Sequence, residues 1–215
     1  MKFILENLIG IVSITILTLN TIILSCLLIP LGLIKFFLPI TNIKVLFTKF
    51  IINIGELWIF TNKIWVKALH KPNWEIIGKE NIKSNGWTIA TSNHQSFADI
   101  FLLQDITNMK MPMLKFFMKY VLIYVPIIGL SWWALDMPFL KRYTKKQLEK
   151  NPKLVGKDVK EMKRALKHYS LYPVTVFSFA EGTRFTVKKH RNQNSPFDNL
   201  LKPKEGGLAT ALSLV

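Results

Sequence analysis

The sequence of 215 residues contains a single cysteine, Cys26, and acidic residues are scarce, with 13 Asp and Glu against 29 Lys and Arg. One cysteine cannot build a disulfide framework or a cysteine-based zinc site, and this fits a reducing, cytosolic compartment. No helix-turn-helix, zinc-finger or RNP pattern is present, so we expect no nucleic-acid partner. The formal net charge of +16 instead suits an anionic lipid surface.

Charged residues are also absent between Glu6 and Lys35. As a helix rising ~1.5 Å per residue, the part of this apolar run before Pro30 could cross a ~30 Å hydrocarbon layer. A cleaved signal peptide is the alternative, but the run exceeds the ~7–15 residues of its apolar region and no small-x-small site follows. Lysines cluster after the run, so the positive-inside rule predicts that the rest of the chain lies on the cytoplasmic face. The membrane that we expect is the inner (cytoplasmic) membrane.

A second apolar stretch, from about Val45 to Lys67, carries one polar stripe at helical spacing. Its members are Lys49, Asn53, Glu56, Lys63 and Lys67, with Phe60 intruding. Such a helix could lie in the membrane interface, form the second leg of a hairpin, or pack on the soluble domain. The break between legs is expected around Pro30, Gly32 and Pro39. We therefore divide the chain into a membrane-anchoring segment, 1–70, and a domain, 71–215.

From Trp74 onward, short β-rich runs alternate with helix-like stretches. Strands are expected at Trp74–Ile77, Trp87–Ser92, Tyr172–Phe179, near Lys115–Lys119 and within Gly129–Arg142, and helices at about Ala98–Ile106 and Val155–Tyr169. Pro126 disfavours an uninterrupted helix over Tyr120–Leu130. The alternation predicts an α/β fold with a central, mostly parallel sheet flanked by helices, preceded by a membrane helix or helical hairpin.

The segment 92–99, SNHQSFAD, begins at the end of an apolar strand and enters a helix, where side chains project into a crevice. There Asp99 could accept a hydrogen bond from one ring nitrogen of His94 and leave the other nitrogen to take a proton from a substrate hydroxyl. A polar N-capping cluster is the alternative explanation. Ser96 is disfavoured as a nucleophile, since no Gly-x-Ser-x-Gly elbow occurs and His94 is only two residues away.

The segment 179–184, FAEGTR, again follows an apolar strand directly. Gly182 lets backbone approach an anion closely, Thr183 offers a hydroxyl, and Arg184 can fork onto two phosphate oxygens. This pattern indicates a phosphate clamp, and the alternative is a surface turn with a solvated arginine.

Together, Asn-His-x-x-x-x-Asp and Glu-Gly-Thr-Arg resemble the glycerophospholipid acyltransferase family, which includes 1-acylglycerol-3-phosphate acyltransferases, over roughly 74–212. The block 132–142, WWALDMPFLKR, and the run 201–204, LKPK, look like the YihG-like branch and its lysocardiolipin acyltransferase relatives. The resemblance implies that His94 and Asp99 are the catalytic pair. It implies acceptor binding by residues of the second and third blocks: Arg142, Glu181, Gly182, Thr183 and Arg184.

The implied reaction moves a fatty-acyl group from a coenzyme A or acyl carrier protein thioester to the free, sn-2 hydroxyl of lysophosphatidic acid or a related lysophospholipid. The thioester is a co-substrate, neither a cofactor nor a metal is expected, and the expected partners are membrane lipids and, as a candidate, acyl carrier protein. Lys141 stands where many members carry an acidic residue, so the phosphate contacts of the second block are expected to differ there. The fourth family block should follow Leu212, so we expect a domain truncated at its C-terminus. The alternatives are a thioesterase or lipase that activates water, and a non-catalytic lipid-binding remnant.

Overall fold

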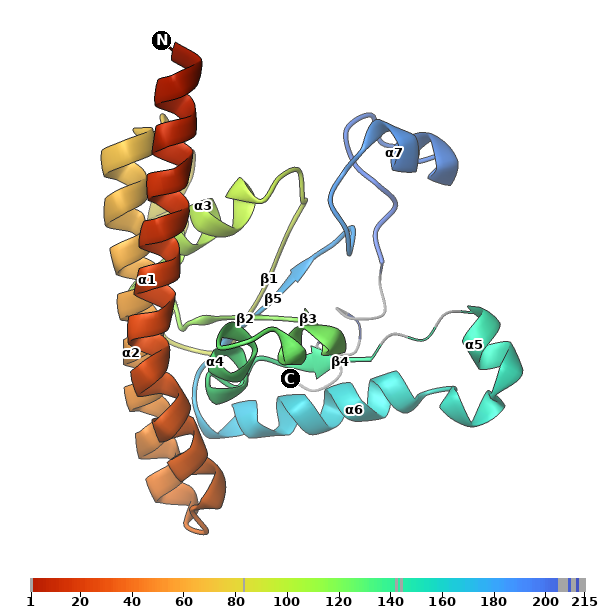
Figure 1. Cartoon of the computed structure of the whole chain (residues 1–215). Helices are drawn as coiled ribbons and strands as arrows, with labels where there is room; N and C mark the ends of the chain where they lie inside the picture. The colour runs from red at the N-terminus through yellow and green to blue at the C-terminus, as the bar shows by residue number, and fades with distance from the viewer. Residues whose placement is uncertain are drawn as a thin grey trace.

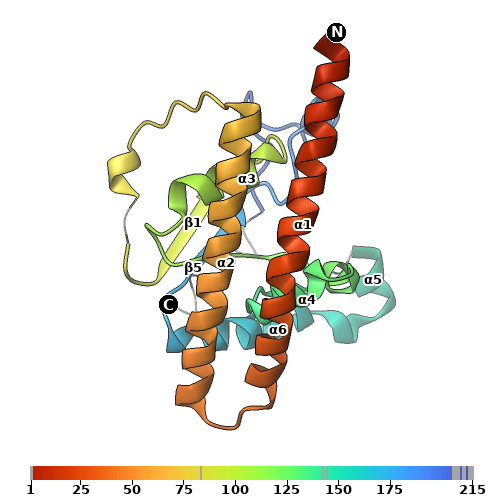
Figure 2. The ribbon, with the colours of Figure 1, turned by 60° about the vertical axis from the view of Figure 1, so that its left-hand side comes forward.

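The structure, a computed structural model, describes residues 2–82, 84–141, 143, 145–204, 209 and 212. Two long helices, α1 (Lys2–Phe37) and α2 (Thr41–His70), lie side by side and are joined by a short connection (Figures 1 and 2). Among the described helices, α1 alone is long and apolar enough to cross a membrane. The N-terminal segment is therefore a helical hairpin, and its second helix is longer than the predicted one.

The predicted break at Pro30 and Gly32 is wrong, because α1 continues through both residues to Phe37. Only Pro39 lies in the connection between the helices. Gly32 faces Ala134, and a Cβ atom at Gly32 would lie 2.5 Å from that residue's Cβ. The absence of a side chain at Gly32 thus allows α1 to pack closely on the domain. The neighbouring Leu28 is buried in the shared core and Leu31 packs against it, which offsets the loss of the backbone hydrogen bond that Pro30 cannot make.

The central sheet is parallel, with the order β1 (Thr88–Ser92), β5 (Thr175–Phe179), β2 (Leu114–Phe116). A second, two-stranded parallel sheet pairs β3 (Met118–Lys119) with β4 (Phe139–Leu140). This arrangement confirms the predicted α/β fold. The remaining elements are η1 (Lys79–Asn81), α3 (Ala98–Thr107), η2 (Tyr120–Tyr124), α4 (Ile128–Ala134), α5 (Lys145–Lys150), η3 (Pro152–Leu154), α6 (Lys157–Leu166), η4 (Lys167–Leu171) and α7 (Val187–Gln193).

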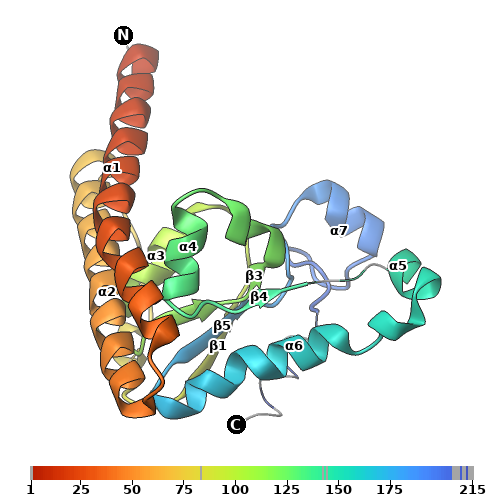
Figure 3. The same ribbon diagram turned by 60° about the horizontal axis from the view of Figure 1, so that its bottom comes forward.

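Helices cover both faces of the central sheet. On one side, Val174 and Val176 of the β5 segment pack with Met162 and Leu166 of α6, which runs beneath the sheet in Figure 3. On the other side, Ile51 and Ile59 of α2 share a core with Met113, Leu135 and Met137. Helix α2 is therefore the second leg of the hairpin and also packs on the domain, so it combines two alternatives that the sequence left open.

A partly buried polar cluster fastens the hairpin to the domain. The Lys35 ammonium at the end of α1 lies 2.8 Å from both carboxylate oxygens of Asp136, which also accepts the Tyr172 hydroxyl at 2.9 Å. The Tyr169 hydroxyl donates to the Asp136 carbonyl at 2.6 Å. Lys115 is fully buried beside this cluster and donates to the Leu135 carbonyl at 2.6 Å. Each charge thus has a partner that offsets part of its desolvation.

Several predicted elements need correction. Residues Trp74–Ile77 form no strand but an extended segment and a turn, and Ile77 is 90% exposed, so its apolar side chain has no sheet to pack on. The run Lys115–Lys119 divides between β2 and β3, which belong to different sheets. The strand predicted to begin at Tyr172 begins at Thr175, while β1, α3 and the additional strand before Arg142 are confirmed.

Candidate active site

The two motif segments meet because their strands are parallel neighbours. Ser92 at the end of β1 pairs with Phe179 at the end of β5, so the segments that leave these strands emerge at the same sheet edge. The Phe185 N–H donates to the His94 carbonyl at 2.7 Å, which ties the second segment to the first. The His94 ring stacks on Phe179, with 3.8 Å between ring centroids.

His94 and Asp99 form the expected pair. His94 Nδ1 lies 2.9 Å from Asp99 Oδ2, and the same oxygen accepts the N–H groups of Gln95 at 2.7 Å and Ser96 at 2.9 Å. Burial alone would raise the pKa of Asp99, but the hydrogen bonds from His94, Ser96 and Gln95 outweigh it and lower the pKa below its usual value. A carboxylate at this position favours the tautomer with the proton on Nδ1, so Nε2 presents a lone pair.

Asp99 therefore has two functions at once. Its carboxylate accepts the backbone N–H groups of Gln95 and Ser96 in the loop before α3, and it also orients the histidine ring. The N-cap residue of α3 is Phe97, which makes no side-chain capping hydrogen bond, so Asp99 does not cap the helix as the alternative proposed. Ser96 donates no hydrogen bond to His94 among the described contacts, and its Oγ accepts the Ala98 N–H at 2.8 Å instead.

An apolar cavity of about 650 Å³ begins at His94 and extends between the sheet and the hairpin. Phe97 and Arg184 are exposed members of its lining and mark its mouth, beside the partly exposed Gly182 and Thr183. The buried and partly buried lining includes Met113, Phe116, Trp132, Leu135, Met137 and Phe177, and the hairpin contributes Leu24, Leu28 and Gly55. A mostly apolar cavity with a few convergent polar groups is the usual form of a small-molecule site.

The third-block residues divide into two kinds. Glu181 is 2% exposed, and its two oxygens accept the N–H groups of His94 at 2.9 Å and Leu201 at 3.0 Å. Gly182, with φ of 64°, lies in the left-handed region that glycine adopts at little cost, and it turns the chain toward the cavity. Arg184 stacks over the Phe97 ring, 3.8 Å from its centroid, at the cavity mouth.

The cluster contains residues that motif analysis did not single out. Lys189 Nζ on α7 lies 2.8 Å from Thr183 Oγ1 and 2.9 Å from the Arg184 carbonyl, so it braces the turn that carries both. The Thr186 hydroxyl caps α7 by accepting the Lys189 N–H at 3.2 Å. In the sequence, the contact between Lys189 and Thr183 is indicated only by Thr186, a residue that can cap a helix, and by the lysines that follow it. Arg142 lies outside the residues that the structure describes.

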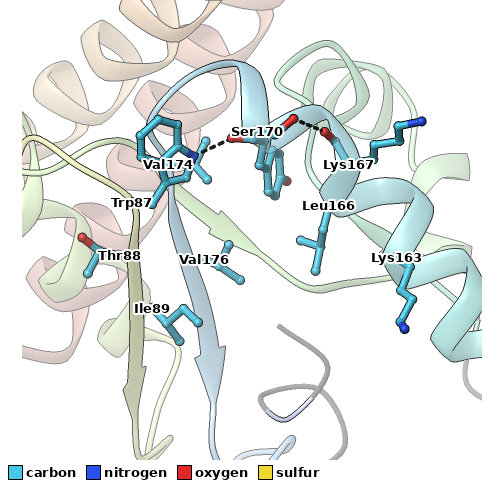
Figure 4. Close-up of a pocket in the computed structure, with 10 residues that line it drawn as sticks. Trp87, Thr88, Ile89, Lys163, Leu166, Lys167, Ser170, Val174 and Val176 are labelled. Carbon is cyan, nitrogen blue, oxygen red and sulfur yellow. Dashed lines mark hydrogen bonds between the residues drawn. The ribbon is translucent and has the colours of Figure 1, made fainter. Parts of the chain in front are cut away.

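A second cavity, of about 870 Å³, lies on the α6 side of the sheet (Figure 4). Trp87, Leu166 and Val176 line its apolar wall, and Trp87 Nε1 donates to the Tyr169 carbonyl at 2.6 Å. Its lining contains neither a histidine nor any predicted site residue. Among the described residues, no cluster of three His, Cys, Asp or Glu could hold a metal ion. The chemistry is therefore assigned to the first cavity.

Comparison with known proteins identifies the family of the chain. The acyltransferase family model matches residues 73–214, most of the chain, and the chain belongs to this family. It is 29% identical over 184 residues to 1-acyl-sn-glycerol-3-phosphate acyltransferase 3 of Arabidopsis thaliana. This alignment covers 75% of this chain and 44% of that protein. The chain thus spans less than half the length of this relative. The crystal structure of the 1-acyl-sn-glycerophosphate (LPA) acyltransferase PlsC from Thermotoga maritima is 20% identical, with a TM-score of 0.47, over 95% of this chain and 71% of that one.

Proposed function

We propose that the chain transfers a fatty-acyl group from an acyl thioester to the free hydroxyl of a lysophospholipid of the lysophosphatidic acid type. The observation that carries this proposal is the His94–Asp99 pair at the wall of an apolar cavity whose mouth holds Arg184. A relative named for acylating 1-acyl-sn-glycerol-3-phosphate supports the same acceptor class.

In the proposed reaction, His94 Nε2 takes the proton of the acceptor hydroxyl as its oxygen attacks the thioester carbonyl carbon. The tetrahedral intermediate then collapses, the carbon–sulfur bond breaks, and the proton passes from His94 to the leaving thiolate. Asp99 holds the ring by its Nδ1 and stabilises the imidazolium while the proton resides there. No covalent acyl-enzyme is needed, because the base activates the acceptor directly.

The ends of the substrates differ in chemistry, and so do the ends of the cavity. An acyl chain suits the apolar interior, and the acceptor phosphate suits the mouth, where Gly182, Thr183 and Arg184 lie. We assign Glu181 to holding the loop of His94, since both of its oxygens already accept backbone N–H groups. Coenzyme A and acyl carrier protein both remain candidate carriers of the thioester.

We further propose that the protein works at the cytoplasmic face of the inner membrane. The support is the apolar helix α1, whose exposed side chains include Leu19, Ile23 and Leu27, and the lysines that follow it in the sequence. Such a location would supply the lipid acceptor directly.

His94→Ala tests the proposal. Transfer to lysophosphatidic acid should fall by at least ~10²–10⁴-fold, the contribution of a general base, with protein level and membrane association unchanged. Asp99→Asn should also lower transfer, by no more than His94→Ala. The matched control is His168→Ala, an exposed histidine on η4. Near-normal transfer in His94→Ala would refute the mechanism.

Two results with the wild type would favour the alternatives. Hydrolysis in place of transfer would indicate a thioesterase or lipase, and lipid binding without turnover would indicate a non-catalytic remnant.

Arg184→Lys tests the phosphate clamp, because lysine keeps the charge but loses the two-pronged fork. A charge-assisted contact contributes roughly 1.5–3 kcal/mol, so the acceptor kcat/KM should fall about ten- to a hundred-fold, through KM. Arg191→Lys, on the exposed side of α7, is the control. If the thioester KM rises and the acceptor KM does not, Arg184 belongs to the donor side.

A further inference from the structure

An exposed apolar patch lies on the segment between β3 and the first turns of α4, at residues 121–130. Its members, with their exposed fractions, are Val121 (65%), Tyr124 (73%), Val125 (38%), Ile127 (40%) and Leu130 (46%). Large apolar side chains exposed together on one short segment indicate a surface that meets an apolar partner. In Figure 3 this green segment forms the upper edge of the domain between α1 and α7.

The backbone of the 121–130 patch is held in place. The Ile128 N–H donates to the Pro126 carbonyl at 2.7 Å, which makes a γ-turn centred on Ile127. Ile127 has φ of 65° and ψ of −63°, a conformation that costs energy in a β-branched residue. The Ser131 N–H and hydroxyl both bond the Ile127 carbonyl, at 3.1 and 3.0 Å. The fold thus presents these apolar side chains outward in a fixed arrangement.

The surroundings of the patch match the chemistry of a lipid interface. The rings of Tyr120 and Tyr124 meet edge to face, 5.9 Å apart, and Lys141 Nζ lies 4.3 Å from the Tyr120 ring centroid. Lys119 is exposed beside them. Tyrosine with an apolar body and a polar tip, and lysines that extend toward headgroups, are the side chains enriched at membrane–water boundaries.

The patch also continues the apolar surface of the membrane hairpin. Helix α4 packs against α1, and the Trp133 and Phe36 rings lie 5.8 Å apart. Phe36 and Phe37 at the end of α1 are 62% and 77% exposed. Because α1 presents apolar side chains along its length, a bilayer that receives α1 can reach the adjoining patch without a second binding event.

We propose that the 121–130 patch is a second membrane-contact surface, which inserts into the headgroup and upper acyl region beside α1. Leu122 and Ile128 of the same segment line the catalytic cavity, so this contact places the lipid surface next to the cavity wall. Entry of the lysophospholipid from the bilayer at this point rests on the proposed reaction, whereas the membrane contact itself rests only on the proposed membrane location of α1.

The test measures how deeply the patch lies in lipid. The full chain carrying Cys26→Ala and Val121→Cys is labelled with a bimane fluorophore and inserted in nanodiscs of phosphatidylcholine and phosphatidylglycerol that hold one chain each. Quenching by lipid-borne nitroxides is compared with quenching by water-soluble iodide. Tyr124→Cys provides a second site in case one variant does not fold. Val155→Cys, 69% exposed and remote from the patch, is the matched control, and native Cys26 on α1 is the lipid reference.

We expect labels at 121 and 124 to be quenched by lipid nitroxides at least several-fold more than the label at 155, and to approach the label at Cys26. Quenching by iodide at 121 and 124 equal to that at 155 would overturn the proposal. Protection from both quenchers would also overturn it, since it would indicate that protein covers the patch. These readouts need no turnover, so a failure here is distinct from a failure of the proposed reaction.

Discussion

Glu181→Gln changes the charge of a side chain that is 2% exposed while it keeps nearly the same shape. The carboxylate accepts two backbone N–H groups, one from His94 and one from Leu201. Glutamine has one acceptor oxygen, and its NH₂ group must face the second N–H. The substitution therefore removes a hydrogen bond and brings two donors together in a buried position.

A hydrogen bond to a charged group contributes about 1.5–3 kcal/mol, so the free energy of unfolding should fall by about 2 kcal/mol. For a chain of this size the melting temperature should fall by about 4–8 °C. Since one of the two bonds fixes the His94 backbone, kcat should fall about ten- to a hundred-fold, the loss that a small misplacement of a catalytic group causes. The acceptor KM should stay nearly constant.

The assay combines thermal unfolding, followed by tryptophan fluorescence in detergent, with initial rates at varied acceptor concentration. Glu75→Gln, which changes an exposed glutamate in the same way, is the control and should leave all three quantities unchanged. An unchanged melting temperature with a raised acceptor KM would refute this reasoning. It would make Glu181 an acceptor ligand, as the family resemblance implied.

Two further predictions concern the core between hairpin and domain. Burial lowers the pKa of Lys115 from 10.5 to about 8, although the negative charge of Asp136 acts in the opposite direction. Between pH 8 and 10.5 the unfolded chain therefore binds more protons than the folded chain, so the free energy of unfolding rises with pH, by at most about 3 kcal/mol. Lys115→Met should abolish this rise, measured as the difference from wild type in unfolding free energy at each pH, and an unchanged slope would contradict the assignment. Removal of residues 1–70 uncovers Met113, Leu135 and Met137, so the remainder should aggregate in size-exclusion chromatography. A monodisperse product would show that the hairpin is dispensable for the core.

The parts that sequence predicted well depend on local patterns. His94 and Asp99 are five residues apart at a strand–helix junction, so one turn of chain brings them within hydrogen-bond distance. The strands β1 and β5 are apolar runs bounded by polar segments, and α3 begins at Ala98, directly after the segment that carries His94. In each case the information lies within a few residues of the element.

The parts that sequence missed depend on distant partners. Trp74–Ile77 has the composition of a strand, but among the described strands none pairs with it. Pro30 is tolerated within α1 because helix packing, which no local rule reports, stabilises the turns around it. The hydrogen bond between Glu181 and His94 joins residues 87 positions apart, and no motif states whether a carboxylate faces a ligand or a backbone N–H. Long-range packing therefore decided each of these cases.

The hairpin also contributes to the cavity. Leu24 and Leu28 of α1 and Gly55 and Trp58 of α2 form one wall of the cavity that starts at His94. A soluble domain without these helices would hold the catalytic pair at the end of β1 but would leave the apolar site open to water on that side. Because an apolar chain gains its binding energy from exclusion of water, α1, the helix apolar enough to cross a membrane, also helps to close the proposed acyl site. The proposed membrane association and the proposed acyl-chain binding therefore share one element, so substitutions that loosen the hairpin should weaken both.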